Sequence, residues 1–529
     1  MERIDFSALY SEEELKRQKW CRDNREVLTY RPLISITVPV YRTPINLLDE
    51  MIASVVQQSY DNWELCIVNA SPEQKELCRR LSEWQEADER IRVKDLELNG
   101  GISANTNACF EMVRGEYVGM LDHDDLLTEN ALFEIVWCLQ ERPELDFLYS
   151  DQDMIDENST KRFNPLYKPE WSQEMLYSGN YITHFSVLRT SLIREIGGWE
   201  PRTDGAQDWD LFLKAGEHTD KIHGIEQILY HWRMASTSTA TSMETKSYAL
   251  DAQLRAIKEH LDRKGETQAE VVFQNRDILK TRIKWNREHD RDISVIVLDE
   301  GRTEHLKLQV QLIRAALHMN EKEIIVVSAD EGRLACLKDA GCKCVNGAFS
   351  NWAEGYRMGA EYACGEVLLF CTDGVSPMHY DTFYELADWA KYDRVAVAAP
   401  RILKDEYTLR SMGIALTENG IIPMFEGCTT HKTLSNGFVY WYRNISAADY
   451  NCFAIRRSLF EEAGGFLNES GAGAMAVFCL ELSRRGYRHM VTPYAEIMLK
   501  GKTMTEQYDG VDKTICEKYS ISGDDKYYR

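Results

Sequence analysis

The sequence lacks any apolar run long enough to cross a bilayer, and it lacks the features of an exported chain. A spanning helix needs about 18 or more consecutive apolar residues, and no such run occurs. The first residues, Met1-Glu-Arg-Ile-Asp, hold none of the apolar core of a signal peptide. We therefore expect a cytoplasmic protein without a membrane-spanning segment.

Positive charge and paired cysteines are also scarce. The chain has 62 Lys and Arg against 85 Asp and Glu, a net charge of −23, which argues against nucleic acid as a partner and against broad adsorption to anionic lipid. Its 14 cysteines stand mostly singly, as Cys66 and Cys371 do within apolar runs, which is typical of reduced core thiols. Cys342-Lys-Cys344 has no second pair or histidine at ligand spacing, so we interpret it as structural.

What the chain does contain is a regular alternation of strand and helix patterns. Its 529 residues suggest about two to four domains. After a predicted N-terminal helix within 11–30, short apolar runs at 33–41, 63–68, 91–95 and 115–121 read as strands, with helical patterns between them. This alternation predicts an α/β fold with a mostly parallel sheet and helices on both faces.

The pattern then restarts near Ile293 as an internal repeat. Cys364-Gly-Glu-Val-Leu-Leu-Phe-Cys371 matches Arg114-Gly-Glu-Tyr-Val-Gly-Met-Leu121, and Arg457-Ser-Leu-Phe-Glu-Glu-Ala-Gly-Gly-Phe466 matches Thr190-Ser-Leu-Ile-Arg-Glu-Ile-Gly-Gly-Trp199. Two matches in the same order indicate two copies of one fold. We predict an N-terminal helical segment at 1–30, a first copy at 31–265, a linker at 266–291 and a second copy at 292–529.

An acidic turn, Asp122-His-Asp-Asp125, follows the predicted strand 115–121. Ligands of open α/β sheets bind outside the carboxyl ends of the strands. Carboxylates this close repel one another unless a cation lies among them, and a divalent ion with diphosphate oxygens in its shell would relieve that repulsion. The alternative is a solvated acidic turn that caps the next helix.

The repeat separates these two interpretations. Without gaps, the alignment places Thr372, Asp373 and Gly374 opposite Asp122, His123 and Asp124; Met475 and Val477 opposite Asp208 and Asp210; and Met498, or Leu499 after a slip of one residue, opposite His231. The second copy thus keeps the apolar framework but loses the acids and the histidine together. Joint loss is expected if these residues form one site, so we predict a catalytic first copy and a non-catalytic second copy.

The motifs together resemble those of a known family. Val38-Pro-Val-Tyr41, Asn99-Gly-Gly-Ile-Ser-Ala-Asn-Thr-Asn107, Leu121-Asp-His-Asp-Asp125, Tyr149-Ser-Asp-Gln-Asp153, Gly205-Ala-Gln-Asp-Trp-Asp210 and Tyr230-His-Trp-Arg233 occur in this order. The set resembles family 2 glycosyltransferases with the GT-A fold, in particular bacterial rhamnosyltransferase-like enzymes of cell-surface polysaccharide synthesis. The resemblance covers about 30–260 closely and 292–500 as a degraded copy, which implies two tandem GT-A domains with mostly parallel sheets.

The resemblance implies a donor site. Pro39, Val40 and Tyr41 match the segment that lies against the nucleobase and ribose of the donor. The position of Asn69 usually holds an acid that hydrogen-bonds the base, so asparagine is a departure that puts this contact and the base preference in doubt. Asn105, Asp122 and His123 complete the implied donor-binding set.

The resemblance also implies a metal site. Asp122 and Asp124 match the DxD pair of the family, with Asp124 as the direct ligand and Asp122 nearer the ribose or a metal-bound water. His231 matches a histidine that completes the metal shell in some relatives; the alternative is a buried strand histidine. The cofactor is then Mn²⁺ or Mg²⁺, and a neutral imidazole ligand suits Mn²⁺ better.

The chemistry of sugar transfer requires one positioned base for the acceptor hydroxyl. Asp208, at a helix start, matches the family base, and an in-line displacement with one base inverts the anomeric centre. Asp210 is the competing base, although two residues further along a helix its side chain points elsewhere. Trp209 and Trp199 are candidates for stacking on the acceptor sugar, and core packing is an equal alternative for both.

These expectations describe an inverting, metal-dependent glycosyltransferase. Its donor would be a nucleoside-diphosphate sugar such as dTDP-rhamnose or a UDP-sugar, and its acceptor a growing glycan or polyprenyl-linked glycan, with possible peripheral contact at the inner face of the membrane. One rival is a glycoside hydrolase, which also uses two carboxylates but needs no DxD-type metal cluster. The other is a non-catalytic saccharide-binding or scaffold protein of a polysaccharide-assembly complex.

Overall fold

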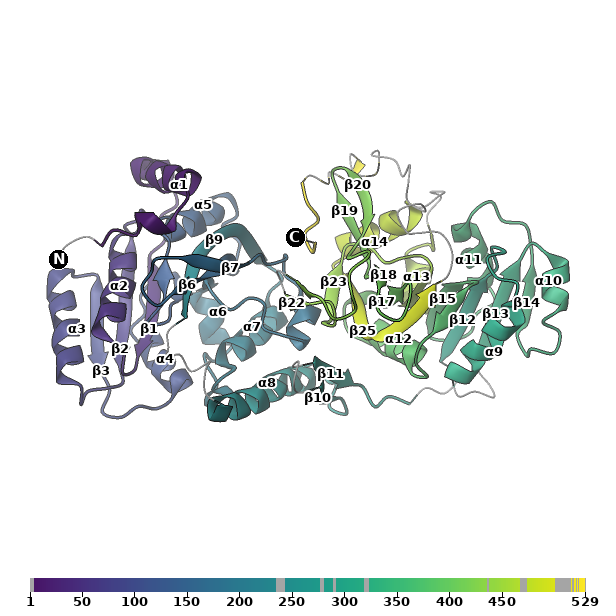
Figure 1. The fold of residues 1–529 in the computed structure, drawn as a ribbon, viewed down its shortest axis with the longest axis horizontal. Coiled ribbons are helices and arrows are strands. Elements are labelled where there is room, and N and C mark those ends of the chain that lie inside the picture. The colour runs from purple at the N-terminus through teal and green to yellow at the C-terminus, as the bar shows by residue number, and fades with distance from the viewer. Residues whose placement is uncertain are drawn as a thin grey trace. The chain divides into compact units, whose positions relative to one another are not determined.

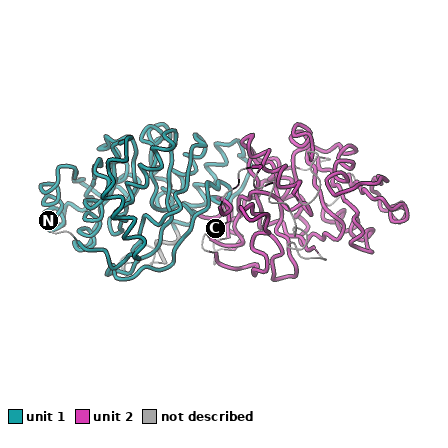
Figure 2. The backbone as a smooth tube through the Cα atoms, turned by 90° about the horizontal axis from the view of Figure 1, so that it is seen from above, with its two compact units in different colours: residues 1–176, 180–271 teal, residues 177–179, 272–529 magenta. Residues whose placement is uncertain are grey.

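The structure is a computed structural model of the chain, and it describes residues 4–234, 243–275, 280–288, 292–317, 323–434, 437–466, 473–499, 515, 518–519, 521 and 523–528, with side chains described outside 243–247. The chain forms two compact units (Figure 2). The first unit holds residues 1–176 and 180–271, and the second holds residues 177–179 and 272–529. Among the described residues, no helix is both long and apolar enough to cross a membrane.

The first unit is built on one mixed sheet (Figure 1). The strands are β1 (Ile34–Val40), β2 (Trp63–Asn69), β3 (Ile91–Asp95), β4 (Tyr117–Met120), β5 (Leu126–Leu127), β6 (Phe147–Asp156), β7 (Arg162–Leu166), β8 (Ser186–Arg189) and β9 (Ile222–Met234). Their order is β3-β2-β1-β4-β8-β6-β9-β5, with β7 paired to β6. Strands β1 to β4 pair in parallel, whereas β8 runs antiparallel to both β4 and β6.

The helices of this unit follow the strands in sequence, as the alternating pattern predicted. The α-helices are α1 (Glu12–Asp23), α2 (Ile45–Val56), α3 (Lys75–Ala87), α4 (Ile102–Phe110), α5 (Ala131–Glu141), α6 (Thr190–Glu195), α7 (Gln207–His218) and α8 (Met243–Arg263), and the 3-10 turns are η1 (Ser7–Leu9), η2 (Arg25–Val27), η3 (Gln173–Tyr177) and η4 (Pro201–Thr203). A capping box of Ser11 and Glu14 starts α1, because the serine side chain and the glutamate side chain each satisfy a free N–H of the first turn. Arg17 holds α1 to α5 through Glu134, at 2.7 Å.

Two stretches without a clear strand pattern in the sequence contain strands. Residues 154–180 include the end of β6 and all of β7, and the predicted linker 266–291 includes β10 (Glu270–Asn275) and β11 (Lys280–Lys284), which pair with each other. Most residues of β7 and β10 are exposed or half-buried. Such strands carry no buried apolar run, which is the pattern that makes a strand recognisable in a sequence.

The second unit repeats the sheet of the first. Its strands are β12 (Ile293–Leu298), β13 (Glu323–Ser328), β14 (Lys343–Asn346), β15 (Val367–Thr372), β16 (Val375–Pro377), β17 (Val395–Leu403), β18 (Leu409–Ser411), β19 (Ile414–Thr417), β20 (Gly420–Pro423), β21 (Thr433–Leu434), β22 (Gly437–Phe438), β23 (Arg443–Ile445), β24 (Cys452–Arg456) and β25 (Arg488–Leu499). The order β14-β13-β12-β15-β24-β17-β25-β16 corresponds strand by strand to that of the first sheet. Additional strands β18 and β23 pair with β17 and β25, and β19-β20 and β21-β22 form separate pairs.

The helices of the second unit also follow the repeat. They are α9 (Leu306–Ala316), α10 (Glu331–Ala335), α11 (Trp352–Ala360), α12 (Thr382–Lys391), α13 (Arg457–Glu462) and α14 (Ala474–Arg484). The two halves therefore share an α/β architecture with mostly parallel pairing in the leading half of each sheet, and this confirms the predicted fold class.

A buried polar network joins β1, β2 and the turn before β4 in the first unit. The hydroxyl of Ser35 on β1 donates to Glu64 on β2 at 2.6 Å and accepts from the N–H of Gly115 at 2.9 Å. Glu64 also accepts from the N–H of Arg114 at 2.6 Å. A Cβ atom on Gly115 would lie 2.5 Å from both the Leu33 carbonyl oxygen and the Ser35 hydroxyl, so only glycine fits before β4.

The second unit contains the same network at the corresponding positions. Ser294 donates to Glu323 at 2.7 Å and accepts from the N–H of Gly365 at 2.8 Å, while Glu323 accepts from the N–H of Cys364 at 2.8 Å. A Cβ atom on Gly365 would lie 2.6 Å from the Ser294 nitrogen. The glycine of the Gly-Glu pair that revealed the repeat is thus explained by close packing, which both copies need.

Candidate functional site

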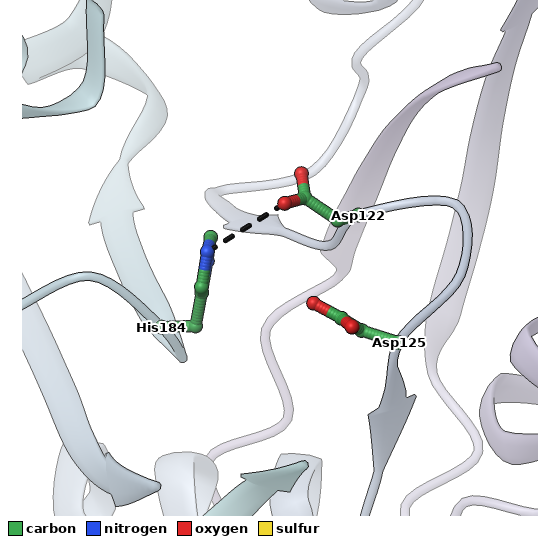
Figure 3. A group of neighbouring side chains, drawn as sticks. All are labelled: Asp122, Asp125 and His184. Atoms are coloured by element: carbon green, nitrogen blue, oxygen red, sulfur yellow. Dashed lines mark ion pairs between the residues drawn. The ribbon is translucent and has the colours of Figure 1, made fainter. Parts of the chain in front are cut away.

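Three side chains converge where β4 ends. Asp122 and Asp125 lie on the turn between β4 and β5, and His184 precedes β8, the antiparallel neighbour of β4. One ligand atom of each residue lies within 4.8 Å of those of the other two, and Figure 3 shows the three side chains pointing toward one another. Nε2 of His184 is 3.6 Å from Oδ2 of Asp122.

The three residues differ strongly in their access to solvent. The Asp122 side chain is 49% exposed and that of His184 is 17% exposed, whereas Asp125 is 1% exposed. Burial, followed by the charges of Asp124 and Asp122, raises the pKa of Asp125 well above its ordinary range. Burial also raises the pKa of Asp124, to which Asp122 contributes. The two carboxylates and the imidazole offer oxygen and nitrogen ligands, a donor set that fits a divalent cation.

Asp208 lies in the first turn of α7 and belongs to the same electrostatic neighbourhood. Its Oδ2 accepts a hydrogen bond from Asn180 Nδ2 at 2.9 Å, and its Oδ1 accepts one from the N–H of Trp209 at 2.8 Å. Burial raises the pKa of Asp208; the charge of His184 opposes that rise and the charge of Asp122 adds to it. A carboxylate with a raised pKa beside a cation-binding cluster suits a general base.

One short segment, 180–184, connects the carboxylate of Asp208 with the acidic turn. It begins with Asn180, which contacts Asp208, and ends with His184, which contacts Asp122. The buried side chain of Gln152 on β6 accepts from the N–H of His184 at 3.1 Å, and the buried ammonium of Lys168 donates to Gln152 at 3.1 Å and to the carbonyls of Ile182 and His184. Gln152 and Lys168 thus hold the segment in place, although neither belongs to the cluster of Asp122, Asp125 and His184.

The predicted metal ligands separate in the structure. Asp122 belongs to the converging group, but Asp124 and His231 do not. His231 is fully buried on β9, where Nδ1 lies 2.5 Å from Oδ1 of Asp153 and Nε2 lies 3.1 Å from the hydroxyl of Tyr10. Both ring nitrogens of His231 thus have partners within the protein, whereas His184 lies with Asp122 and Asp125. A metal-binding role for His231 stays a prediction.

A comparison of two variants tests whether His184 or His231 binds the metal. We expect His184→Asn to weaken Mn²⁺ binding about 10- to 100-fold, the usual cost of disturbing a metal's ligand environment. His231→Asn should instead lower the melting temperature, because it leaves Asp153 and Tyr10 without their buried partner. Isothermal titration with Mn²⁺ and thermal unfolding measure the two effects, and the reverse outcome would restore His231 as the ligand.

The predicted donor-binding residues lie at the ends of the first strands, and several are engaged locally. Asn69 donates from Nδ2 to Oδ1 of Asp95 at 2.8 Å across the ends of β2 and β3. Asn105 donates to Asn99 at 2.8 Å and accepts from the N–H of Gly100, so it shapes the turn before α4. Their contact with a donor stays a prediction.

The remaining donor-side residues differ in exposure. Pro39 and Val40 are buried in β1, whereas Tyr41 is 39% exposed just beyond it. Nδ1 of His123 is 3.7 Å from Oδ1 of Asp124. Tyr41 is the most exposed of these side chains, and the Arg42 guanidinium lies 5.1 Å from its ring centroid. Contact of Tyr41 with a nucleobase stays a prediction.

The two predicted acceptor-stacking tryptophans are core residues. Trp209 is 4% exposed and its Nε1 donates to the carbonyl of Leu176 at 2.7 Å. Trp199 is 3% exposed and packs edge-on against Phe110, with ring centroids 5.8 Å apart. Neither ring offers a free face, so the structure favours the packing alternative for both.

Sequence reasoning missed His184 and Asn180. The segment that contains them follows a polar stretch that reads as loops, and their proximity to the acids depends on the antiparallel pairing of β8 with β4. The repeat carried a usable signal, because the corresponding registers of β8 and β24 place Asn451 at the position of His184. Extending the repeat alignment backward from Thr190 would have exposed this histidine-to-asparagine exchange.

The second unit replaces the whole cluster. Strand registers place Thr372, Val375, Asn451 and Met475 at the positions of Asp122, Asp125, His184 and Asp208. The hydroxyl of Thr372 donates to Oδ1 of Asn451 at 3.1 Å, so a neutral hydrogen bond occupies the place of the acid–histidine pair.

The end of β12 in the second unit is closed by its own ion pairs. Arg333 bonds both oxygens of Asp299, at 2.6 and 2.7 Å. The buried Asp373 accepts from the N–H groups of Glu300 and Thr303 at 2.9 Å each, and Arg333 lies 3.5 Å from it. Both acids thus have hydrogen-bond and ion-pair partners within the second unit.

Comparisons with known proteins agree with this geometry. Residues 35–197 match the family model "Glycosyl transferase family 2". The y4gI protein of Sinorhizobium fredii is 31% identical over 490 residues, which are 88% of this chain and 53% of that protein. The O-antigen biosynthesis protein RfbC of Myxococcus xanthus is 30% identical over 510 residues, which are 93% of this chain and 39% of that protein.

The chain thus spans about half the length of the first relative and less of the second. Among solved structures, residues 1–349 of Staphylococcus aureus TarS are 18% identical, with coverage of 44% of this chain and 84% of that chain and a TM-score of 0.33. The sequence match to the family model covers the strands and turns that hold Asp122, Asp125 and His184. Residues 35–197 of this chain thus match glycosyltransferase family 2 as one domain.

Proposed function

We propose that the first unit transfers a sugar from a nucleoside-diphosphate donor to a glycan acceptor, with inversion at the anomeric carbon. The observation that supports the proposal most directly is that a candidate metal-binding cluster and a candidate general base lie close together. A cation-binding set of Asp122, Asp125 and His184 lies beside Asp208, a carboxylate held by Asn180. Donor activation and acceptor deprotonation require these two elements.

The reaction follows from the position of Asp208. Its carboxylate takes the proton of the acceptor hydroxyl as that oxygen forms a new bond to the anomeric carbon. The bond from this carbon to the donor phosphate oxygen breaks on the opposite face, and the nucleoside diphosphate leaves with the electron pair. One displacement with one base inverts the configuration. The hydrogen bonds from Asn180 and the Trp209 N–H leave the base in a single orientation.

The donor diphosphate would meet the acidic turn through a divalent cation. Asp122, Asp125 and His184 are the residues that would hold it, because their ligand atoms converge within 4.8 Å of one another. When bound, Mn²⁺ or Mg²⁺ supplies Lewis-acid stabilisation of the charge that develops on the leaving phosphate. Asp124 contributes its charge to the same turn, 3.7 Å from His123.

The substrates follow from the same relatives and motifs. The donor is a nucleoside-diphosphate sugar, with dTDP-rhamnose and UDP-sugars as first candidates, placed by Tyr41 and the Asn69–Asp95 pair. The acceptor is a growing glycan or polyprenyl-linked glycan at the inner face of the membrane. The name of the Myxococcus xanthus relative, an O-antigen biosynthesis protein, supports a polysaccharide acceptor.

The second unit, in this proposal, is non-catalytic. It keeps the packing network of Ser294, Glu323 and Gly365 but carries Met475 where the first unit has its base. The Arg333 ion pairs with Asp299 and Asp373 occupy the end of β12, where the first unit would receive a nucleotide.

Replacing Asp373 tests this division of labour. We expect Asp373→Ala to lower the stability of the second unit by about 1–3 kcal/mol, because two backbone N–H groups lose their buried acceptor. Sugar transfer at saturating donor should stay within about twofold of the parent rate. Calorimetric unfolding and a transfer assay on the same preparation measure both. A hundredfold loss of transfer with an intact fold would assign catalysis to the second unit.

The proposed function is tested with a panel of nucleotide sugars. Binding and slow hydrolysis of dTDP-rhamnose, UDP-hexoses and GDP-mannose are measured with and without Mn²⁺. Metal-dependent turnover of one donor identifies the transferase and its sugar. Metal-independent cleavage of a glycan would point to a hydrolase, and absence of nucleotide binding under every condition would leave the scaffold role for the whole chain.

A further inference from the structure

Tyr230 contacts every member of the converging group. Its hydroxyl donates to Oδ2 of Asp125 at 2.5 Å and accepts from the backbone N–H of Asp122 at 3.3 Å. Its ring stacks on that of His184, with centroids 4.6 Å apart and an interplanar angle of 15°. One side chain on β9 therefore fixes a carboxylate, a backbone segment and an imidazole that come from two separate stretches of the chain.

The surroundings of Tyr230 leave it no alternative position. The residue is fully buried, and Phe185 stacks near its ring at 6.4 Å. Its backbone is paired with Leu127 on β5, directly after the acidic turn. On the other side of Asp125, Oδ1 accepts from the N–H of Arg233 at 2.7 Å. Strand β9 thus holds both oxygens of Asp125 and sets the direction of that carboxylate.

The second unit provides an independent observation. The register of β5 with β9 corresponds to that of β16 with β25, and it places Ile497 at the position of Tyr230. The tyrosine is lost in the copy that also lost Asp122, Asp125 and His184, although the buried Ser294 network is retained there. A residue needed only for packing of the sheet would be expected in both units, as the Ser294 network is, and not to be lost together with the cluster.

We propose that Tyr230 is a positioning residue that orients Asp122, Asp125 and His184 for binding of the divalent cation. This inference rests on the proposed function, since it concerns the same cluster. The hydroxyl directs the carboxylate of Asp125 and holds the turn at Asp122, while the ring sets the plane of the His184 imidazole. Outer groups that orient metal ligands in this way change metal affinity by about 10- to 100-fold when they are removed.

The test is the Tyr230→Phe variant of the full chain, which deletes the hydroxyl and keeps the ring. Mn²⁺ affinity is measured by electron paramagnetic resonance of free Mn²⁺, without donor or acceptor, so the readout is independent of turnover. We expect a loss of about 10- to 100-fold. The matched control is Tyr117→Phe, which deletes another buried hydroxyl of the same sheet, one that donates to the Leu145 carbonyl at 2.9 Å. Its Mn²⁺ affinity should stay within about twofold of the parent chain.

A second variant covers the case in which Tyr230→Phe folds poorly. Tyr230→Ile introduces the side chain that the second unit carries at this position, and we expect it to lose at least as much Mn²⁺ affinity, because the ring is also gone. If either folded variant binds Mn²⁺ as tightly as the parent chain, Tyr230 has a packing role and the inference is overturned. If the parent chain binds no Mn²⁺ either alone or with a nucleoside diphosphate present, the proposed metal-dependent function fails first.

Discussion

Asp208→Asn is expected to abolish sugar transfer while nucleotide binding persists. Asparagine has nearly the same shape as aspartate but cannot take up the acceptor proton, and loss of a positioned general base lowers kcat by about 10²- to 10⁴-fold. The donor side of the site, built from Asp122, Asp125 and His184, is unchanged by this substitution. Transfer rate and calorimetric binding of the nucleoside diphosphate are measured on the same variant.

The pH profile gives a second readout for Asp208. Burial raises its pKa above the ordinary value of 3.8. Because the base acts in its deprotonated form, kcat/KM of the parent chain should fall as the pH drops through this raised pKa. The residual activity of Asp208→Asn should lack that acidic limb. A variant that keeps more than about a tenth of the parent rate would remove Asp208 as the base.

The matched control is Asp210→Asn, two residues further along α7. Asp210 is fully buried and pairs with Lys214, with Oδ2 at 2.6 Å from Nζ. Its substitution should lower the melting temperature, since the lysine loses its buried partner, and leave kcat within about threefold of the parent value. Loss of kcat in Asp210→Asn together with full activity in Asp208→Asn would exchange the two roles.

Removal of the divalent metal is the second change with a large expected effect. Chelation should lower transfer by about 10²- to 10³-fold, because the charge on the leaving phosphate then lacks its counter-charge. Added Mn²⁺ should restore the parent chain. Asp122→Ala should show the same loss without chelator, and Mn²⁺ should not restore it, because the exposed ligand of the cluster is missing.

Asp49→Ala is the control for loss of an acid from the same unit. Asp49 lies on α2 and pairs with Arg80 at 2.7 Å, apart from the cluster. Its variant should respond to chelation and to Mn²⁺ as the parent chain does. Full transfer by the parent chain in excess chelator would contradict the metal dependence, and restoration of Asp122→Ala by Mn²⁺ would remove Asp122 from the ligand set.

The sequence contained most of the fold and part of the site, for identifiable reasons. Buried strands such as β1 and β4 are short apolar runs, and the acids after β4 lie where parallel sheets bind ligands. The Gly-Glu pairs at 115–116 and 365–366 revealed the repeat because glycine is sterically required there. These signals are local in the chain, so the residues themselves carry them.

The parts that could not be predicted depend on pairing between distant segments. His184 lies near Asp122 because β8 runs antiparallel to β4. The polar sequence around His184 does not predict this strand pairing. His231 is bonded by Tyr10, from the N-terminal segment, and by Asp153, from β6. These contacts between distant segments, which engage both ring nitrogens, cannot be read from the motif around His231. Burial of Trp209 is likewise a tertiary property, because an aromatic residue at a helix start suits either a core or a sugar platform.

The Ser–Glu–Gly network found in both units can be used to recognise copies of this fold that have lost their catalytic residues. Ser35, Glu64 and Gly115 recur as Ser294, Glu323 and Gly365, although every acid and histidine of the cluster has changed. The network links β1, β2 and the turn before β4 in the first unit, and the corresponding elements in the second. Its spacing therefore identifies the fold in active and inactive copies alike. A search for inactive relatives should therefore score a serine, a glutamate and a glycine at these strand positions ahead of the acidic motif.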